Sequence, residues 1–391
     1  MRICIVVETF PAVSETFIIN KVLSLIALGH KVQVVCFKKT NEASVIFSTH
    51  NLSKNNITIN KINFSTNLLS ILRNFAISPS LFFKSISFSY ETFKRKYKYN
   101  YLTWFINKIK YDVIHFEFSG LGIFFLPVID RLKGAKTVSC RGTAENVKLL
   151  DDTERQKSLS KLFKKVDLIH CVSEKMKETV EPFCRDKNKL FVNTPAVDTS
   201  IFKPTTNKNE NQIFTIVSVG RLSFVKGHLI GLLAIKHLVQ QGFNVVWKVV
   251  GDGPELEQIQ FHIHTLGIEK NVQLLGKRTH DEVNETLNSA NALILTSYSE
   301  GIPNVVLEAM SKEIPVVTTN CGGVSEVIEN GKDGFIVDLY AHEAMAEKIA
   351  ILMQNEILAK QIGKAARQKI IEKFSIENQA KTFYKFYSSV V

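Results

Sequence analysis

The sequence predicts an α/β protein built from two doubly wound, Rossmann-like domains in tandem. Short apolar runs alternate with helical patterns along the whole chain, which is typical of parallel sheets with crossover helices. A polar interruption, KPTTNKNENQ from Lys203, separates two such series, and 391 residues are too many for one ordinary core. We therefore expect two domains that face each other across a cleft, with ligands bound at the carboxyl ends of the strands.

Each series supplies its own predicted strands. The first series reads RICIVV, KVQVVCF, DVIHF, KTVSC and VDLIHCV, and the second reads IFTIVSVG, NVVWKVVG, NVQLLG, NALILT, IPVVTT and GFIVD. The predicted domains span residues 1–204 and 205–374. The last stretch, 375–391, has a helical pattern, and we expect it to pack back onto the first domain.

The composition is typical of a soluble globular protein, with 45% apolar and 22% charged residues. No apolar run approaches the roughly 18 residues of a membrane span. The first strand, MRICIVV, meets Glu8 at once, unlike a signal peptide, so we expect a cytoplasmic protein. The six cysteines are scattered and form no C-x-x-C pair, and we interpret them as buried thiols.

Positive charge is concentrated in the first half of the chain. Residues 1–200 hold 30 Lys and Arg against 17 Asp and Glu, whereas the remainder holds 19 against 20. Segment 62–110 interleaves cations with aromatics, as in FKRKYKYNYLTWFINKIKY from Phe93. This pattern predicts contact with an anionic membrane surface, and hence a peripheral position on the inner face of the plasma membrane. The alternative is a pair of helices with aromatic core faces.

Two cations follow the first strand of the second series. In GRLSFVKG, Arg221 and Lys226 lie on the loop between a strand and a helix, where a planar fork and a point charge suit a diphosphate. They could equally be solvated side chains beside a turn. Farther along, Gly251 and Gly253 in VVGDGP allow close backbone approach, for a ligand or for packing alone, and Pro254 opens a helix.

Two carboxylates frame the segment SEGIPNVVLEAM. Gly301 and Pro303 interrupt the pattern between Glu300 and Glu308, and Asn304 is the predicted N-cap of a helix. Backbone N–H groups near Asn304 and Val305 are then free to donate to phosphate oxygens. Glu308 can hold two vicinal ribose hydroxyls, while Glu300 turns into the cleft from the loop. The alternative is that both glutamates are surface helix charges.

These motifs together resemble a known family. In order and spacing, GRLSFVKG, VVGDGP, SEGIPNVVLEAM and IPVVTTNCGGVSEVIENGKDGFIV resemble glycosyltransferase family 4, retaining enzymes with the two-domain GT-B fold. ETFPAVSETFIINKVLSLIALGHKV is similar to the polysaccharide-building branch with an S-E-T-F-I signature. The resemblance implies that a UDP- or GDP-linked sugar is moved to a hydroxyl of a lipid-linked glycan in surface polysaccharide synthesis. Arg221 and Lys226 would bind the donor diphosphate, Glu308 the ribose, and Glu300 a hydroxyl of the transferred sugar.

The N-terminal half departs from the family pattern. Arg141 and Gly142 stand where many members have a His-Gly pair, so Arg141 is expected to meet a donor carboxylate or phosphate, or to pair with Glu145. Ala12-Val13-Ser14 replaces two glycines before Glu15. The candidates for the acceptor or sugar side are Ser14, Glu15, His115, Arg141 and Gly142. His115, at the end of a strand, is alternatively a structural histidine.

The sequence contains no D-x-D motif, so we expect no metal and no cofactor. Charge on the departing nucleoside diphosphate would be met by Arg221, Lys226 and the helix N-terminus. The main rival is a nucleotide-sugar epimerase or hydrolase of the same architecture. A phosphorylase would need a pyridoxal-binding lysine that we cannot place, nucleic-acid binding has no recognised module behind it, and a silent sensor would not need all four charged residues.

Overall fold

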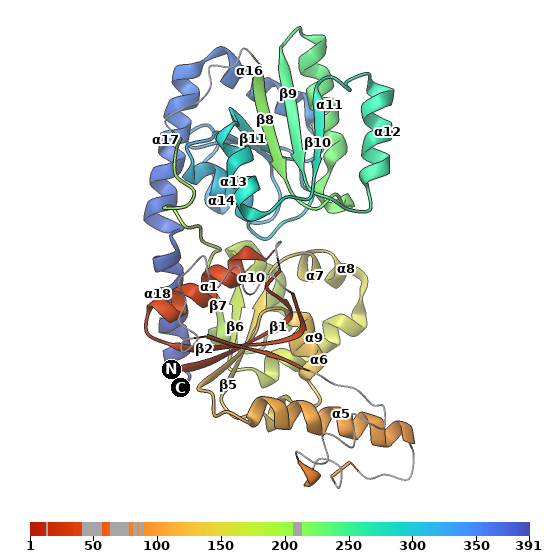
Figure 1. Ribbon diagram of the computed structural model, residues 1–391, viewed down its shortest axis with the longest axis vertical. Coiled ribbons are helices and arrows are strands. Elements are labelled where there is room, and N and C mark those ends of the chain that lie inside the picture. Colours follow the sequence, from red (N-terminus) through yellow and green to blue (C-terminus); the bar gives the residue numbers. More distant parts are fainter. Residues whose placement is uncertain (13–14, 41–56, 63–77, 81–83, 86–89, 206–212) are drawn as a thin grey trace. The chain divides into compact units, whose positions relative to one another are not determined.

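A computed structural model describes residues 1–12, 15–40, 57–62, 78–80, 84–85, 90–205 and 213–391 (Figure 1). The described chain forms two compact units. The N-terminal unit comprises Met1–Cys171, Lys177–Asn193 and Ala380–Val391, and the C-terminal unit comprises Val172–Met176 and Thr194–Gln379. The chain therefore passes between the units more than once, and its last residues belong to the N-terminal unit.

The N-terminal unit is built on a seven-stranded parallel sheet with the order β3-β2-β1-β4-β5-β6-β7. Its strands are β1 (Arg2–Phe10), β2 (Lys31–Lys39), β3 (Ile57–Lys61), β4 (Val113–Phe116), β5 (Ala135–Cys140), β6 (Leu168–Cys171) and β7 (Leu190–Val192). All five predicted runs are strands. Strands β3 and β7 were not predicted from the sequence.

Helices cover both faces of this sheet. They are α1 (Thr16–Ala27), α5 (Tyr90–Asn107), α6 (Ser119–Phe125), α7 (Thr143–Asn146), α8 (Lys148–Asp151), α9 (Thr153–Lys165), α10 (Glu174–Val180) and α18 (Ile376–Ser388), with short 3-10 turns η1 (Ile129–Arg131), η2 (Glu181–Phe183) and η3 (Lys187–Lys189). On one face, Ile3, Ile5 and Val7 share a core with residues of α1 and α18. On the other, α6 packs onto β4 through a Phe116–Phe125 ring contact.

Helix α5 divides its side chains between core and surface. Tyr97, Tyr101, Leu102 and Ile106 are buried, whereas Arg95 and Lys96 are exposed. The alternative prediction, helices with aromatic core faces, therefore holds for Tyr97 and Tyr101 of α5. Residues 63–77, 81–83 and 86–89 of the basic segment lie outside the described residues, so contact with a membrane surface stays a prediction. Among the described helices, none is long and apolar enough to cross a membrane.

The C-terminal unit is built on a six-stranded parallel sheet with the order β10-β9-β8-β11-β12-β13. Its strands are β8 (Phe214–Val219), β9 (Val245–Val250), β10 (Val272–Gly276), β11 (Ala292–Leu295), β12 (Val316–Thr319) and β13 (Phe335–Val337). Its helices are η4 (Phe224–Lys226), α11 (His228–Gln240), α12 (Leu256–Leu266), α13 (His280–Asn288), α14 (Asn304–Ser311), α15 (Val324–Val327), α16 (His342–Gln354) and α17 (Glu356–Lys373). The two parallel sheets confirm the predicted α/β class.

Strand β11 shows why these runs are apolar throughout. Ala292 and Ile294 belong to the core that α11, α12 and α16 cover, while Leu293 and Leu295 belong to the core under α14 and α17. A strand buried on both faces needs an apolar residue at every position. Because all strands run the same way, the loops after β8, β9, β11 and β13 gather at one edge. All six cysteines are free and buried, as predicted.

Candidate active site

The loop after β8 holds the two predicted cations. Arg221 is exposed, and within the described residues no partner of its side chain is found. Lys226 ends the short turn η4, and Gly227 follows in the left-handed region with φ +57°. A Cβ at Gly227 would lie 2.3 Å from the carbonyl oxygen of Thr296, so only glycine allows this loop to pack against the end of β11.

Lys226 and Glu300 meet across the loops after β8 and β11. The Nζ of Lys226 donates to Oε1 of Glu300 at 2.5 Å, and Ser297 Oγ donates to the same oxygen at 2.7 Å. The two side chains are 24% and 15% exposed. A hydrogen bond from the Gly323 N–H to the Gly301 carbonyl, at 2.8 Å, fixes the loop that carries Glu300. The pair is therefore held in place yet remains open to solvent.

Helix α14 begins directly after this loop. Its N-cap is Pro303, with φ −76° and ψ 122°, and Asn304 is the first helical residue. The prediction of Asn304 as N-cap is thus wrong by one position, because proline's fixed φ suits the turn before the helix. Val306 N–H bonds to the Pro303 carbonyl, while no acceptor is found in the described chain for the N–H groups of Asn304 and Val305. These two donors suit an anion.

Glu308 lies one turn into α14 and is 9% exposed. Burial raises the pKa of its carboxyl to about 7. Within the described residues no hydrogen bond or ion pair to this carboxylate is found. Burial weakens the hydration of this carboxylate, so the site favours a ligand that brings hydroxyl groups to Glu308.

The glycines after β9 have a structural reason of their own. Gly251 has φ +149°, and a Cβ there would lie 1.8 Å from the carbonyl oxygen of Gly220. A Cβ at Gly253 would lie 2.2 Å from the carbonyl oxygen of Leu222. The two loops thus touch backbone to backbone, which accounts for both glycines through packing alone. Helix α12 begins at Leu256, later than Pro254 suggested.

In the N-terminal unit, a charged cluster occupies the carboxyl ends of β4 and β5. Glu117 is fully buried between Lys21, whose Nζ lies 2.7 Å from Oε1, and Arg141, whose NH2 lies 2.7 Å from Oε2. Burial alone would raise the pKa of Glu117, but the two cations together hold it well below its usual value. The Arg141 guanidinium also stacks 4.4 Å from the centroid of Phe17, and no hydrogen-bond partner of its buried Nε is found among the described residues.

This cluster corrects one of the two alternatives for Arg141, the pairing with Glu145, while contact with a donor stays a prediction. Its side chain pairs with Glu117, while Glu145 pairs with Arg155 at 3.0 Å and accepts only the backbone N–H of Arg141. Position along the chain could not reveal this, because Glu117 comes from another strand. A sequence signal for Glu117 did exist, since it follows β4 at the ligand edge of a parallel sheet. Lys21, on α1, carried no such signal.

The other N-terminal candidates lie in different surroundings. His115 is fully buried, with Nδ1 2.7 Å from Thr137 Oγ1 and Nε2 2.8 Å from Ser139 Oγ, and burial lowers its pKa to about 4. It is a structural histidine in this unit and does not face solvent. Glu15 is half-buried at the N-cap of α1, and burial, then Glu117, raise its pKa to about 7. Gly142 follows Arg141, and Ser14 lies outside the described residues.

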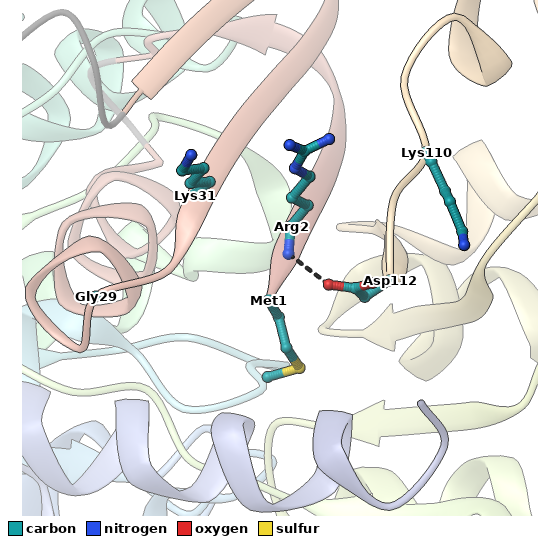
Figure 2. A pocket seen from close by; sticks show the side chains of 6 residues that line it. All are labelled: Met1, Arg2, Gly29, Lys31, Lys110 and Asp112. Atoms are coloured by element: carbon teal, nitrogen blue, oxygen red, sulfur yellow. Dashed lines mark hydrogen bonds between the residues drawn. The ribbon is translucent and has the colours of Figure 1, made fainter.

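A cavity of about 410 Å³ lies at the opposite, amino edge of the same sheet (Figure 2). Met1, Arg2, Gly29, Lys31, Lys110 and Asp112 line it. Asp112 accepts the backbone N–H of Arg2 at 2.7 Å, and the charged ends of Arg2 and Lys110 point in different directions. Because ligands of parallel sheets bind at the carboxyl edge, this cavity is not the candidate active site.

Comparisons with known proteins identify a glycosyltransferase domain in the C-terminal half of the chain. Residues 198–369 match the family described as Glycosyl transferases group 1, so the chain carries a glycosyltransferase group 1 domain. WcaL of Salmonella typhimurium, which bears the name of a colanic acid biosynthesis glycosyltransferase, is 24% identical over 96% of both chains. Capsular polysaccharide biosynthesis glycosyltransferase CapM of Staphylococcus aureus is 31% identical over 52% of this chain and 52% of its own length.

Solved structures agree with the predicted fold. HepE of Anabaena, crystallised with UDP, has a TM-score of 0.78 at 16% identity, with all of both chains covered. A glycosyltransferase from Rickettsia africae has a TM-score of 0.75 at 20% identity, covering 100% of this chain and 98% of the other. At these identities the likeness concerns the fold, and it confirms the prediction of two parallel-sheet domains of the GT-B type.

Proposed function

We propose that the protein is a retaining glycosyltransferase of family 4 that moves a sugar from a UDP- or GDP-linked donor to an acceptor hydroxyl. The observation that carries this proposal is the arrangement at the carboxyl edge of the C-terminal sheet. Arg221, the Lys226–Glu300 pair and the free N–H groups of α14 lie on loops that meet there. Cations and helix N–H groups in this arrangement suit a diphosphate that gains charge as it leaves.

The proposed reaction follows from these groups. The bond between the sugar's anomeric carbon and the diphosphate breaks, the acceptor oxygen bonds to that carbon, and the acceptor's proton is released. Arg221, Lys226 and the start of α14 stabilise the nucleoside diphosphate as it departs. Glu308 would hold the ribose and Glu300 a hydroxyl of the transferred sugar. We propose that transfer needs no divalent metal, because these positive groups take the ion's place.

The proposed pathway is the assembly of a surface polysaccharide on a lipid-linked acceptor at the inner face of the plasma membrane. The names of the relatives support it: amylovoran biosynthesis glycosyltransferase AmsK of Erwinia amylovora is 25% identical over 67% of this chain. An Escherichia coli relative, 25% identical over 73% of this chain, is named as a galactosyltransferase acting on a diphosphoundecaprenol-linked sugar. The basic N-terminal half would suit anionic lipids around such an acceptor.

A two-stage experiment tests this function. UDP- and GDP-sugars are first screened by thermal denaturation, and we expect at least one to raise the melting temperature, since it binds only the folded state. That donor is then incubated with and without a lipid-diphosphate-linked monosaccharide, in the presence and absence of EDTA. Transfer should require the acceptor and survive EDTA. Release of free or epimerised sugar at the same rate without acceptor would instead favour the epimerase or hydrolase.

A further inference from the structure

Three aromatic side chains with no part in the proposed donor chemistry cluster at the carboxyl edge of the C-terminal sheet. Phe224 follows β8, Tyr298 follows β11 and Tyr340 follows β13. The ring centroids of Phe224 and Tyr298 are 5.2 Å apart, as are those of Tyr298 and Tyr340. Phe224 is 70% exposed and Tyr340 67%. Adjoining aromatic rings left open to water indicate a binding surface rather than a core.

The backbone of Tyr340 is strained. Its φ is +67°, a region that residues with a Cβ avoid. The turn around it is fixed by hydrogen bonds from Ala341 N–H to the Asp338 carbonyl and from His342 N–H to the Tyr340 carbonyl. Burial of the ring does not offset this strain, because two thirds of the side chain is exposed. Strain that packing does not explain points to a function for the side chain.

The rings share their loops with the donor residues. Phe224 and Lys226 belong to the same three-residue turn, η4. Tyr298 precedes Glu300 by two residues, and its N–H donates to the Val225 carbonyl at 2.8 Å. A ligand on these rings would therefore lie beside the Lys226–Glu300 pair.

We propose that Phe224, Tyr298 and Tyr340 form an aromatic platform on which a sugar ring of the substrate stacks. The proposal rests on the function proposed above. A pyranose has an apolar C–H face and a polar rim, so it stacks on aromatic rings by dispersion while its hydroxyls stay in water. Because the three side chains are uncharged, the platform does not favour a phosphate or a lipid headgroup.

The donor's base is a less suitable occupant of the platform. Tyr298 packs with the core beneath α11 and α16, whereas Glu308, the proposed ribose contact, is on α14 and belongs to the opposite face of the sheet.

Saturation-transfer NMR with methyl α-D-glucopyranoside, methyl α-D-galactopyranoside and methyl α-D-mannopyranoside tests the platform. Irradiating aromatic protons of the wild-type protein should give signal on the C–H protons of at least one glycoside. Phe224→Ala and Tyr340→Gly should each weaken that signal about three- to tenfold, the loss expected for one ring contact. Glycine adopts φ +67° without strain, so Tyr340→Gly should melt no lower than the wild type.

Phe261→Ala is the matched control, because Phe261 is 65% exposed in the same unit but lies on α12. It should leave the glycoside signal unchanged. The proposal is overturned if no glycoside contacts the wild type, if all three variants behave alike, or if Phe224→Ala and Tyr340→Gly lose UDP and GDP binding while the glycoside signal persists. If glycosides bind as expected but no nucleotide-sugar is turned over, the platform stands and the proposed transferase function fails.

Discussion

Lys226 already has an anionic partner before any substrate binds. Its ammonium lies 2.5 Å from Glu300, so a diphosphate must share this cation with the carboxylate. Arg221 differs, since it is exposed and no partner of its side chain is found in the described chain. The two cations thus offer a fixed charge and an adaptable one at the same loop. Arg221 is the cleaner probe of diphosphate binding, because its removal breaks no ion pair found among the described residues.

Replacing Arg221 or Lys226 with Ala should lower kcat/KM, with a loss of about 2–4 kcal/mol of transition-state stabilisation. Each side chain would stabilise charge that develops on the leaving diphosphate. Steady-state kinetics with the donor found by the screen measures this loss, and circular dichroism checks the fold. Lys360→Ala is the control, because Lys360 is an exposed cation on α17 of the same unit, where it pairs with Glu356. Turnover within about threefold of the wild type for both variants would contradict the assignment.

Glu308 should couple ligand binding to pH and to stability. Its folded-state pKa of about 7 lies above the usual 4.5, so the folded protein holds this proton more tightly than the unfolded chain does. Below pH 4.5 the carboxyl is protonated in both states and does not lower the free energy of unfolding. As the pH rises from 4.5 to 7, only the unfolded chain loses the proton readily, so the free energy of unfolding falls. Glu308→Gln should therefore stabilise the protein at pH 8, by at most about 3 kcal/mol, and much less at pH 5.

The same variant should bind the free nucleoside diphosphate more weakly, because the ribose hydroxyls lose a carboxylate acceptor. Urea denaturation at the two pH values and calorimetry with UDP and GDP measure both effects. Glu300→Gln serves as control and should spare nucleotide binding while lowering turnover. If both variants bind as the wild type does, the ribose role of Glu308 is wrong.

Apolar patterning located most strands but not all. Apolar runs such as KVQVVCF and NALILT are buried on both faces and are strands in the structure. Strands β3 and β7, at the two edges of the sheet, were not predicted, because neither contains a long apolar run: β3, ITINK, is polar at Thr58, Asn60 and Lys61, and β7 has only three residues. In the candidate site, too, only local sequence patterns could be recognised. Local motifs located Lys226, Glu300 and Glu308, but the Glu117–Arg141 pairing depends on which strands are neighbours.

Helix α18 completes the N-terminal core from the far end of the sequence. Phe383 and Tyr387 are 1% and 0% exposed, and the Lys21 ammonium lies 4.0 Å from the Phe383 ring centroid. Phe383→Ala should therefore destabilise the N-terminal unit by roughly 3–5 kcal/mol through loss of burial and a residual cavity. Hydrogen exchange of β1 and β4 reports on that unit. Tyr384→Ala, on the same helix at 47% exposed, should cost far less; equal effects would contradict the packing.

Positive charge is distributed unevenly along the chain. Residues 1–200 carry a net charge of +13 and the remainder −1. The structure shows which cations of α5 are exposed and could contact an anionic surface. Lys94 bonds to Glu91 and Lys98 lies over the Phe124 ring, whereas Arg95 and Lys96 are exposed beside the buried Tyr97. A membrane surface would be met by these cations, since the neighbouring aromatics Tyr97 and Tyr101 are buried.

The protein should pellet with vesicles of phosphatidylglycerol and phosphatidylcholine at low salt, and ionic strength should release it because the attraction is screened. Each exposed cation near an anionic surface contributes about 1 kcal/mol, so changing Arg95 and Lys96 together to Ser should weaken binding about 30-fold. Lys360→Ser with Lys364→Ser removes two exposed cations from α17 in the C-terminal unit and should change binding little. Equal weakening by the two double variants would mean that net charge, not α5, attracts the membrane. Wild-type protein that stays in the supernatant at low salt would remove the membrane surface from the proposal and leave the donor chemistry of the C-terminal unit intact.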